Sequence, residues 1–395
     1  MGFRETAVEK QREEFVRLAL KPGANVSELS RRFGISRECA CKWIGRFRAE
    51  GLAGLQDRSR RPKTSPGRSD GEVEARVLAI RAESNGAWGG RKIARVMAAE
   101  AGLAAPAAST VTAILRRAGK LEANAAEHPG PWTRFERSAP NALWQMDYKG
   151  HFAMTSGQCH PLTAIDDHSR YCVGLEACAG QTTGTVATRL TACFRRYGLP
   201  NAILCDNGSP WGSCGDESPY TMLSVWLLRL GVAVHHGRPY HPQTQGKDER
   251  FHRTLKAEVL NGRSFADIAA AQGRFDAGRH RYNHLRPHEA LDLETPATRY
   301  RPSERGFPET LPAIDYGEGA ILRAVNTAAV IAFENRNWCA GRPFVGEPVA
   351  IRPQPDGTHA VHYCAHRIGT IDNRLVAKEG SHPLIRPPKP EKLST

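Results

Sequence analysis

Three acidic residues stand out because each lies where a carboxylate is costly unless it meets a cation or hydrogen-bond donors. Asp147 ends the apolar run LWQMD, Asp206 ends the run ILCD, and Glu249 follows a polar loop at the start of a predicted helix. Carboxylates with no obligatory His or Cys favour a hard cation, so the set predicts Mg²⁺ or Mn²⁺, as a pair of ions. Such a pair activates a nucleophile and stabilises the leaving oxygen in phosphodiester chemistry. Water as the nucleophile cuts a strand, and a 3′-hydroxyl joins one.

These acids need particular elements to bring them together. Asp147 and Asp206 would meet at one edge of a sheet if their strands were neighbours. The helix of Glu249 carries an apolar stripe at helical spacing, formed by Phe251, Leu255 and Val259. A helix docked on the sheet by this stripe aims Glu249 sideways along the same edge. Arg253 and Lys256 follow at the next turns and are predicted to hold phosphate.

Other residues compete for the same chemistry. Asp248 lies about 100° around the helix from Glu249, over the apolar stripe, and is interpreted as a helix cap or first-turn acid. Asp166 and Asp167 in DDHSR are interpreted as hairpin-turn residues, with metal binding as the alternative. Tyr282 is a conceivable nucleophile, although packing is the favoured interpretation.

Composition narrows the class of protein. The chain has 395 residues, of which 40% are hydrophobic, and a net charge of +14. This length predicts a multidomain protein, and this charge favours a polyanionic partner, nucleic acid first, over a merely basic protein. The 10 cysteines include no C-x-x-C, so neither a disulfide framework nor a zinc ribbon is expected. The most apolar run is broken by Arg229, so we expect no membrane segment and a cytoplasmic protein.

Residues 1–55 are predicted to form a helix-turn-helix DNA-binding domain. Asn25 and Ser36 suit helix caps on either side of a turn at Gly34. A three-helix scaffold with a solvated face is the alternative. The Pro- and Ser-rich linker 56–70 is strongly basic and suited to tracking phosphates. The DNA-binding candidates in these segments are Arg37, Lys42, Arg46, Arg58, Arg60, Arg61 and Lys63.

Residues 71–123 repeat the pattern and are predicted to form a second helix-turn-helix domain, with a helical spacer as the alternative. A linker over 124–138 follows. The DNA-binding candidates in the second domain are Arg91, Lys92, Arg116 and Arg117.

From residue 139 the pattern changes to three strands followed by alternating helix and strand. It predicts an α/β core over 139–302, with a mixed sheet and helices packed on it. Short alternating strands over 318–382 predict a small β-barrel domain, and the Pro- and Lys-rich tail 383–395 is expected to be disordered. A polar loop before Glu249 is interpreted as a mobile grip on DNA, rather than an ordinary polar loop, through His241, Gln243, Gln245 and Lys247.

Several segments of the core occur together in one order: LWQMDYKG, AIDDHSRYCVG, CDNGSPW, RPYHPQTQGKDERFHRTLK and YNHLRPHEAL. With them the core resembles the integrase catalytic core of bacterial insertion-sequence transposases, which are DDE recombinases related to retroviral integrases. The resemblance implies an RNase H-like fold and places the catalytic, metal-binding acids on Asp147, Asp206 and Glu249. The paired helix-turn-helix front and small β tail look like one branch of these transposases, which supports binding to the terminal inverted repeats of a mobile element.

Two features depart from that family. The spacing between Asp206 and Glu249 is longer than usual, with the extra residues assigned to GSCGDES, and Asp248 stands where the family is usually uncharged. Because neither departure removes an acid, we expect an active enzyme that cleaves and joins double-stranded DNA, at element ends and target. A homo-oligomer on DNA, associated with the bacterial nucleoid, is expected. The alternatives are an inactive DNA-binding repressor and an RNase H-like nuclease.

Overall fold

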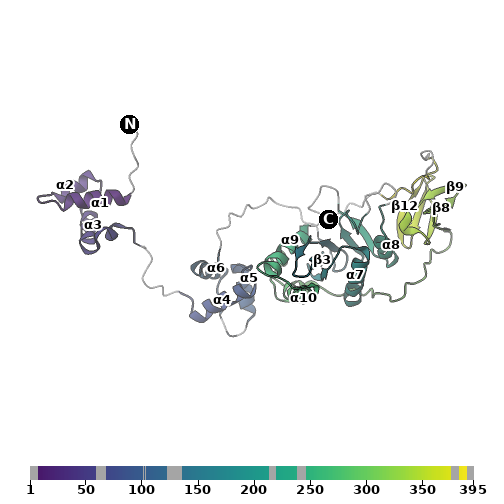
Figure 1. The fold of residues 1–395 in the computed structure, drawn as a ribbon, viewed down its shortest axis with the longest axis horizontal. Coiled ribbons are helices and arrows are strands. Elements are labelled where there is room, and N and C mark those ends of the chain that lie inside the picture. Colours follow the sequence, from purple (N-terminus) through teal and green to yellow (C-terminus); the bar gives the residue numbers. More distant parts are fainter. Residues whose placement is uncertain are drawn as a thin grey trace. The chain divides into compact units, whose positions relative to one another are not determined.

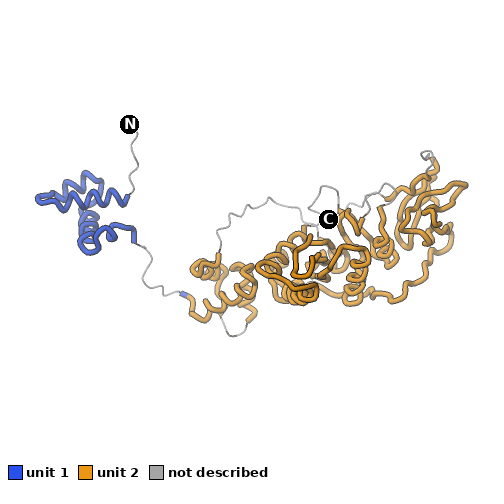
Figure 2. Tube along the Cα trace, in the orientation of Figure 1, with its two compact units in different colours: residues 1–68 blue, residues 69–395 orange. Residues whose placement is uncertain are grey.

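The computed structural model describes residues 8–58, 68–100, 102, 104–121, 136–212, 219–237, 246–374 and 382–388. The chain divides into two compact units, residues 1–68 and 69–395 (Figure 2). Each unit is described by itself below. No helix in the described ranges has the length and apolarity to cross a membrane.

The first unit is a small helical bundle with a helix-turn-helix. Its helices are α1 (Val8–Ala19), α2 (Val26–Arg32), α3 (Arg37–Glu50) and the short η1 (Gly51–Leu55). The Asn25 side chain accepts hydrogen bonds from the first turn of α2, and Ser36 accepts one from the first turn of α3. Gly34 turns the chain between these helices with a φ of 67°. The predicted caps and turn are therefore confirmed, and the bundle closes around the buried ring of Trp43.

The second unit begins with another three-helix arrangement. Its helices are α4 (Gly71–Glu83), α5 (Gly90–Ala99) and α6 (Ala108–Arg117). A Cβ at Gly90 would lie 2.5 Å from the carbonyl oxygen of Ala108, so glycine is what lets α5 and α6 approach so closely. Apolar residues of all three helices share one core, in which Val77, Ile93 and Leu115 are fully buried.

A mixed sheet forms the centre of the second unit, as expected (Figure 1). Its strands are β1 (Trp144–Tyr148), β2 (Phe152–Ala153), β3 (Gln158–Asp166), β4 (Cys172–Cys178), β5 (Ala202–Cys205) and β6 (Ala233–His236). The order is β2-β3-β1-β5-β6, with β4 also paired to β3. β3 is antiparallel to β1 and β4, whereas β5 is parallel to β1 and β6.

Helices cover both faces of this sheet. They are α7 (Thr183–Tyr197), α8 (Met222–Arg229), α9 (Gly246–Leu255), the π-helical η3 (Lys256–Leu260), α10 (Ile268–His284), η4 (Glu289–Leu291) and α11 (Pro296–Arg299). α7 and α8 share one core with the sheet, whereas α9 and α10 share another. The helical run of α9 changes to π geometry at Lys256.

Helix α8 is apolar on two sides because it packs in two cores. Leu223 and Leu227 pack against the central sheet, whereas Val225 and Leu228 pack into the C-terminal module. Figure 1 shows α8 between the two. The most apolar run of the sequence therefore forms a helix that is buried between the central sheet and the C-terminal module.

The C-terminal module consists of sheets, but no closed barrel is found among its described residues, in contrast to the prediction. Its elements are β7 (Ile321–Ala324), β8 (Val330–Phe333), β9 (Arg336–Cys339), η5 (Arg342–Phe344), β10 (Pro348–Pro353), β11 (His359–Tyr363) and β12 (His366–Ile371). One sheet has the order β12-β11-β10-β7, and β8 pairs with β9. A closed barrel would need β7 and β8 to pair through their backbones. Instead, the Arg323 side chain of β7 donates a hydrogen bond of 2.8 Å to the Ala332 carbonyl of β8.

The expected disorder from residue 383 is wrong for residues 383–388. Leu384 bridges to Cys339 of β9 and Arg386 bridges to Thr370 of β12, so this segment links the two sheets. Ile385 is 8% exposed and belongs to the module's core. Its apolar side chain and these backbone bonds offset the chain entropy that a Pro-rich composition suggested would win. Residues 389–395 lie outside the described ranges.

The linking segment should stabilise the module through Ile385. We expect Ile385→Ala to lower the free energy of unfolding by about 2–3 kcal/mol, because it removes a buried side chain. Leu384→Ala is the matched control, since that neighbour is 36% exposed, and should change stability by less than about 0.5 kcal/mol. Urea denaturation measures both. Equal effects of the two substitutions would contradict burial of Ile385.

Candidate active site

Two of the predicted acids stand at the ends of neighbouring parallel strands. Trp144 of β1 pairs with Ile203 of β5, and the next residues of both strands pair in turn. Asp147 lies three residues beyond Trp144 and Asp206 three beyond Ile203, so their carboxylates stand at one level of the same sheet edge.

Backbone donors orient both carboxylates. An oxygen of Asp147 accepts a hydrogen bond of 2.8 Å from the amide of Tyr148. An oxygen of Asp206 accepts one of 3.1 Å from the amide of Gly208. A Cβ at Gly208 would lie only 3.2 Å from the other Asp206 oxygen, so glycine allows the loop to fold over the acid.

Glu249 stands in the first turn of α9. Helix α9 docks on the sheet by Phe251 and Leu255, as the predicted stripe requires. Glu249 is exposed. Burial first, then the negative charge of Asp206 and more weakly that of Glu249, together raise the pKa of Asp147 to about 6, against the lowering effect of the hydrogen bond from the Tyr148 amide. The negative charges of Asp206 and Glu249 therefore act on Asp147, and a bound cation would relieve this repulsion.

Of the two interpretations of Asp248, the structure supports the first-turn acid, and it adds that the residue is buried. This residue is in the first turn of α9, but it is only 1% exposed and points at the sheet. The Thr163 hydroxyl lies 3.1 Å from both of its carboxylate oxygens. Burial, and then the charge of Asp147, raise the pKa of Asp248 well above its ordinary value. The helical wheel placed Asp248 over the apolar stripe correctly, and that position carries it into the protein.

Sequence reasoning missed His252, one turn after Asp248 on the same face of α9. Ligand atoms of Asp147, Asp248 and His252 all lie within 4.8 Å of one another. The His252 ring nitrogen Nε2 is 3.3 Å from an Asp248 oxygen, and burial lowers the pKa of His252 to about 4. The signal was the i,i+4 spacing of Asp248 and His252. This second ligand set shares Asp147 with the predicted one.

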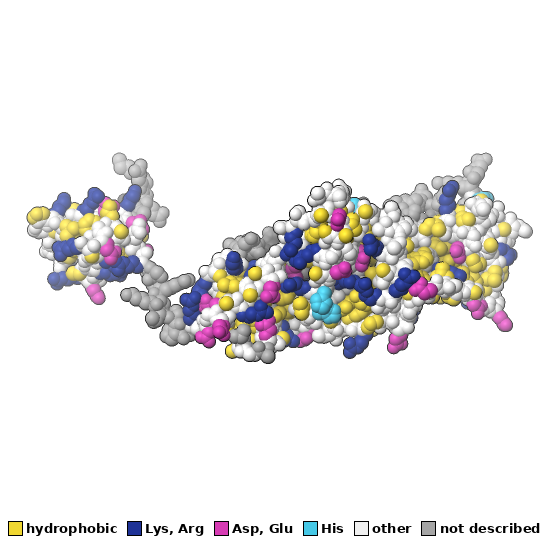
Figure 3. Space-filling view, turned by 60° about the horizontal axis from the view of Figure 1, so that its bottom comes forward, with side chains coloured by type: hydrophobic (Ala, Val, Ile, Leu, Met, Phe, Trp, Pro, Cys, Tyr) yellow, Lys and Arg dark blue, Asp and Glu magenta, His cyan; other side chains and the backbone are white. Residues whose placement is uncertain are grey.

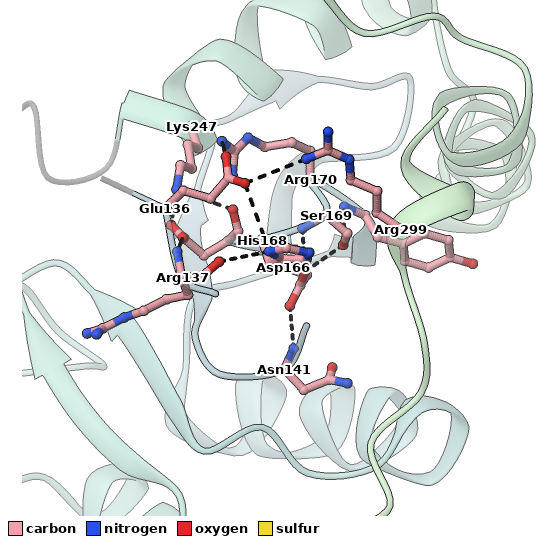
Figure 4. A network of polar contacts seen from close by, with 11 residues as sticks. Glu136, Arg137, Asn141, Asp166, His168, Ser169, Arg170, Lys247 and Arg299 are labelled. Carbon is pink, nitrogen blue, oxygen red and sulfur yellow. Dashed lines mark hydrogen bonds and ion pairs between the residues drawn. The ribbon is translucent and has the colours of Figure 1, made fainter. Parts of the chain in front are cut away.

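The turn after β3 uses its acids for structure, as interpreted from the sequence. Asp166 accepts hydrogen bonds from the amides of Ser169, at 2.8 Å, and Asn141, at 2.6 Å. Asp167 accepts one from the amide of Arg137, also 2.8 Å long. Figure 4 shows these contacts converging on the turn. Both acids are fully buried, and their donors are protein groups.

Lys247 differs from the expected grip on DNA. Its ammonium group pairs with the buried Asp167 carboxylate and also donates to the Asp167 carbonyl at 3.2 Å (Figure 4). The Lys247 side chain is only 14% exposed. Burial lowers its pKa to about 8. Lys247 therefore fastens the start of α9 to the turn after β3.

The remaining DNA-binding candidates divide by exposure. Lys92 and Arg46 are half-buried, Arg58 pairs with Glu50 and Arg117 with Glu74. The exposed ones are Arg37, Lys42, Arg58, Arg91, Arg116, Arg117, Arg253 and Lys256. Those outside the described ranges are Arg60, Arg61, Lys63, His241, Gln243 and Gln245, as is most of GSCGDES. Figure 3 shows basic side chains spread over the surface of both units. Tyr282 is 7% exposed and packs in the core, as favoured from the sequence.

Comparison with known families assigns most of the chain. Residues 137–242 and 230–296 match two integrase core domain families. Residues 11–63 match a helix-turn-helix domain family and residues 39–115 a homeodomain-like domain family. Residues 321–378 match the C-terminal domain of the IS481 family transposases.

Individual relatives match only part of this chain, at low sequence identity. An uncharacterised 31.7 kDa protein of insertion element IS407 from Burkholderia multivorans is 28% identical over 159 residues, covering 40% of this chain and 55% of that protein. An uncharacterised 39.2 kDa protein of insertion element IS476 from Xanthomonas euvesicatoria is 29% identical over 163 residues, covering 40% and 44%. The chain thus spans about half the length of these relatives. The Gag-Pro-Pol polyprotein of Mason-Pfizer monkey virus is 32% identical over 120 residues, covering 30% of this chain and 6% of the polyprotein.

Two solved structures match part of the chain with low sequence identity and low TM-scores. The HTLV-2 integrase catalytic core domain, in complex with magnesium, is 13% identical with a TM-score of 0.32, covering 42% of this chain and 99% of that one. The simian T-cell lymphotropic virus intasome, in complex with a PP2A regulatory subunit, is 15% identical with a TM-score of 0.35, covering 73% and 96%.

The inward position of Lys247 has a measurable consequence. Lys247→Met should lower the free energy of unfolding by about 3 kcal/mol, because it leaves the buried Asp167 carboxylate without its cation. Arg253→Met on the exposed side of the same helix should change stability by less than about 0.5 kcal/mol. Urea denaturation and DNA-binding titrations distinguish the two. If Lys247→Met instead kept full stability and lost DNA affinity, Lys247 would be a phosphate contact after all.

Proposed function

The chain carries helix-turn-helix DNA-binding domains in front of an integrase core of the DDE integrase-like superfamily, and from this premise we propose that it is a DNA transposase. It binds the terminal inverted repeats of a mobile element and catalyses metal-dependent strand cleavage and strand transfer. The names of the insertion-element relatives and the match to a transposase C-terminal domain support this function.

One observation supports the proposal most: the parallel register of β1 and β5 puts Asp147 and Asp206 at one level of the sheet edge, and the charge of Glu249 on α9 acts on Asp147. These three acids are proposed as the catalytic residues. Their oxygens suit Mg²⁺ or Mn²⁺, and they would hold a pair of ions. When bound, such ions activate the attacking oxygen and neutralise charge on the leaving one.

The chain's own groups then orient substrate around the acids. The amides of Tyr148 and Gly208 hold the carboxylates of Asp147 and Asp206 in place. Arg253 and Lys256 are exposed further along α9 and η3, where they would hold backbone phosphates of the DNA end. The exposed basic residues of α3 and α6 would contact DNA in the two helix-turn-helix domains.

Recombination joins ends that must be held together, so we propose that the protein acts as a homo-oligomer on double-stranded DNA. Its substrate places it at the bacterial nucleoid, in the cytoplasm. An inactive repressor derived from a transposase would bind ends without cleaving them, and an RNase H-like nuclease would cleave without regard to sequence.

The identity of the acids can be tested on DNA that carries the element's ends. Asp147→Asn, Asp206→Asn and Glu249→Gln should each reduce metal-dependent cleavage and joining by about a thousandfold, because each removes charge that holds the ions. End binding, measured by gel shift without metal, should stay. Joining that persists in Asp206→Asn would refute the proposed chemistry.

Asp248→Asn is the matched control for Glu249→Gln, because the two acids are adjacent in the chain but point in different directions. We expect Asp248→Asn to lose less than about tenfold in rate, since its carboxylate already contacts Thr163. A loss as large as that of Glu249→Gln would instead assign the ions to Asp147, Asp248 and His252.

The first helix-turn-helix can be tested through Lys42, which is exposed on α3. Lys42→Ala should weaken end binding and reduce the salt dependence of affinity by a slope of about 1, because one phosphate contact is lost. Metal-dependent nicking of non-specific DNA should remain. Lys10 is also exposed but lies on α1, so Lys10→Ala is the control and should bind ends normally. Loss of both binding and nicking in Lys42→Ala would show that α3 is structural.

A further inference from the structure

The second helix-turn-helix domain contacts the helical run that carries Glu249. The turn between α4 and α5 presents Asn85, which has a left-handed φ of 53°. Its side-chain amide donates to the carbonyl of Ala257 at 2.9 Å and to that of Asn261 at 3.2 Å. Both carbonyls belong to η3 or the residue after it, where π geometry disturbs the regular helical bonding. Asn85 thus supplies donors to the end of the catalytic helix from another domain.

A buried carboxylate joins the same two parts. Glu258 of η3 is 8% exposed and accepts a hydrogen bond of 3.0 Å from the indole N–H of Trp88. The same Glu258 oxygen accepts one of 2.8 Å from Arg286, which follows α10. Removing a buried acid from water is unfavourable unless it is paired and hydrogen-bonded. Arg286 pairs Glu258 from within the core and Trp88 adds a donor from the helix-turn-helix, so Glu258 ties the two parts together.

Further contacts extend the joint. Arg95 of α5 forms an ion pair of 2.6 Å with Glu294, beyond η4. Arg286 also reaches the Thr254 hydroxyl of α9, at 3.3 Å. Hydrogen bonds and ion pairs have strict directions, unlike apolar contact alone. The joint therefore fixes the orientation of the second helix-turn-helix and not merely its proximity.

The joint lies at a defined distance from the candidate catalytic acid. Glu249 and Glu258 stand nine residues apart on one continuous helical run, which corresponds to about 14 Å at the rise of an α-helix. A DNA segment bound by the second helix-turn-helix is thereby held at a set distance and rotation from the carboxylates of its own chain.

We propose that the second helix-turn-helix acts as a spacer gauge, docked through Asn85 and Trp88 as positioning residues, that sets where along the DNA the active site cuts. This inference rests on the proposed function. It assigns to the docked domain the choice of cleavage position, in addition to DNA binding. Reading and cutting by one chain in a fixed geometry make the distance between the bound sequence and the cut a property of this joint.

The test uses the full-length protein and duplexes carrying the element's own end. In one duplex, about 5 base pairs, half a helical turn, are inserted between the segment protected by the second domain and the cut position. The variant Asn85→Gly with Trp88→Phe removes the hydrogen bonds that these two residues donate to Ala257, Asn261 and Glu258, while glycine tolerates the positive φ and phenylalanine keeps a ring in the domain core. Asn335→Gly, at a φ of 59° in the C-terminal module, is the matched control.

The wild-type protein and Asn335→Gly should cut the original position in the inserted duplex about tenfold more slowly than in the natural one, because the gauge misplaces it. The double variant should show a ratio within about threefold of unity, with end affinity unchanged within about twofold. A destabilised domain would lose affinity, whereas a released gauge loses only spacing discrimination. Discrimination retained by the double variant, or absent from the wild type, would overturn the proposal.

A footprint separates this inference from the proposed function. The footprint uses the Asp206→Asn protein, because protection of DNA can be measured without cleavage. On the natural duplex, the second domain and the core should protect two segments at a fixed separation. On the inserted duplex, the segment protected by the core should be lost. Adding Asn85→Gly and Trp88→Phe should restore core protection on the inserted duplex. A wild type that never cuts ends would refute the transposase, yet the footprint would still decide the gauge. Identical footprints with and without the joint would reject it.

Discussion

The parallel register of β1 and β5 is the constraint on which the site depends. Carboxylates repel when they are brought together, and nothing in Asp147 and Asp206 themselves favours their proximity. Buried residues of the two strands, Trp144 and Ile203 among them, hold the register because a slip by one residue would turn each strand's core face outward. The burial energy of the sheet therefore maintains an electrostatically unfavourable arrangement, in which burial and then the charge of Asp206 raise the pKa of Asp147.

Helix α9 completes the arrangement because buried charges fasten it at both ends. At its start, Lys247 pairs with Asp167 of the turn after β3. Beyond its end, Glu258 meets Arg286 and Trp88. Between these points Phe251 and Leu255 pack on the sheet. The ion pairs and hydrogen bonds fix the orientation of α9, and the apolar contacts stabilise its packing on the sheet.

The parts of the fold that depend on local sequence patterns could be predicted from the sequence. The stripe on α9, the strands that end in acids and the caps at Asn25 and Ser36 depend on neighbours within a few residues. The burial of Asp248 could not be predicted. A helical wheel shows which side of the helix a residue occupies, but it does not show that the Thr163 hydroxyl lies within hydrogen-bonding distance. The same holds for Lys247, whose partner is distant in sequence, and for the π turn at Lys256, where the carbonyls accept from the distant Asn85. The order of residues 383–388 depends on β9 and β12, which local composition does not reveal.

The two fastenings of α9 also bear on what substrate binding must overcome. A helix held at both ends by buried ion pairs has little freedom to swing, so its backbone is already ordered before DNA arrives. Glu249 is the exposed acid on that helix, and freezing such a side chain costs up to about 2 kcal/mol of rotamer entropy. Ordering a loose helical turn would add about 1–2 kcal/mol for every residue fixed. Most of the entropic cost of ordering α9 is thus met when the protein folds, and not when the proposed DNA substrate binds.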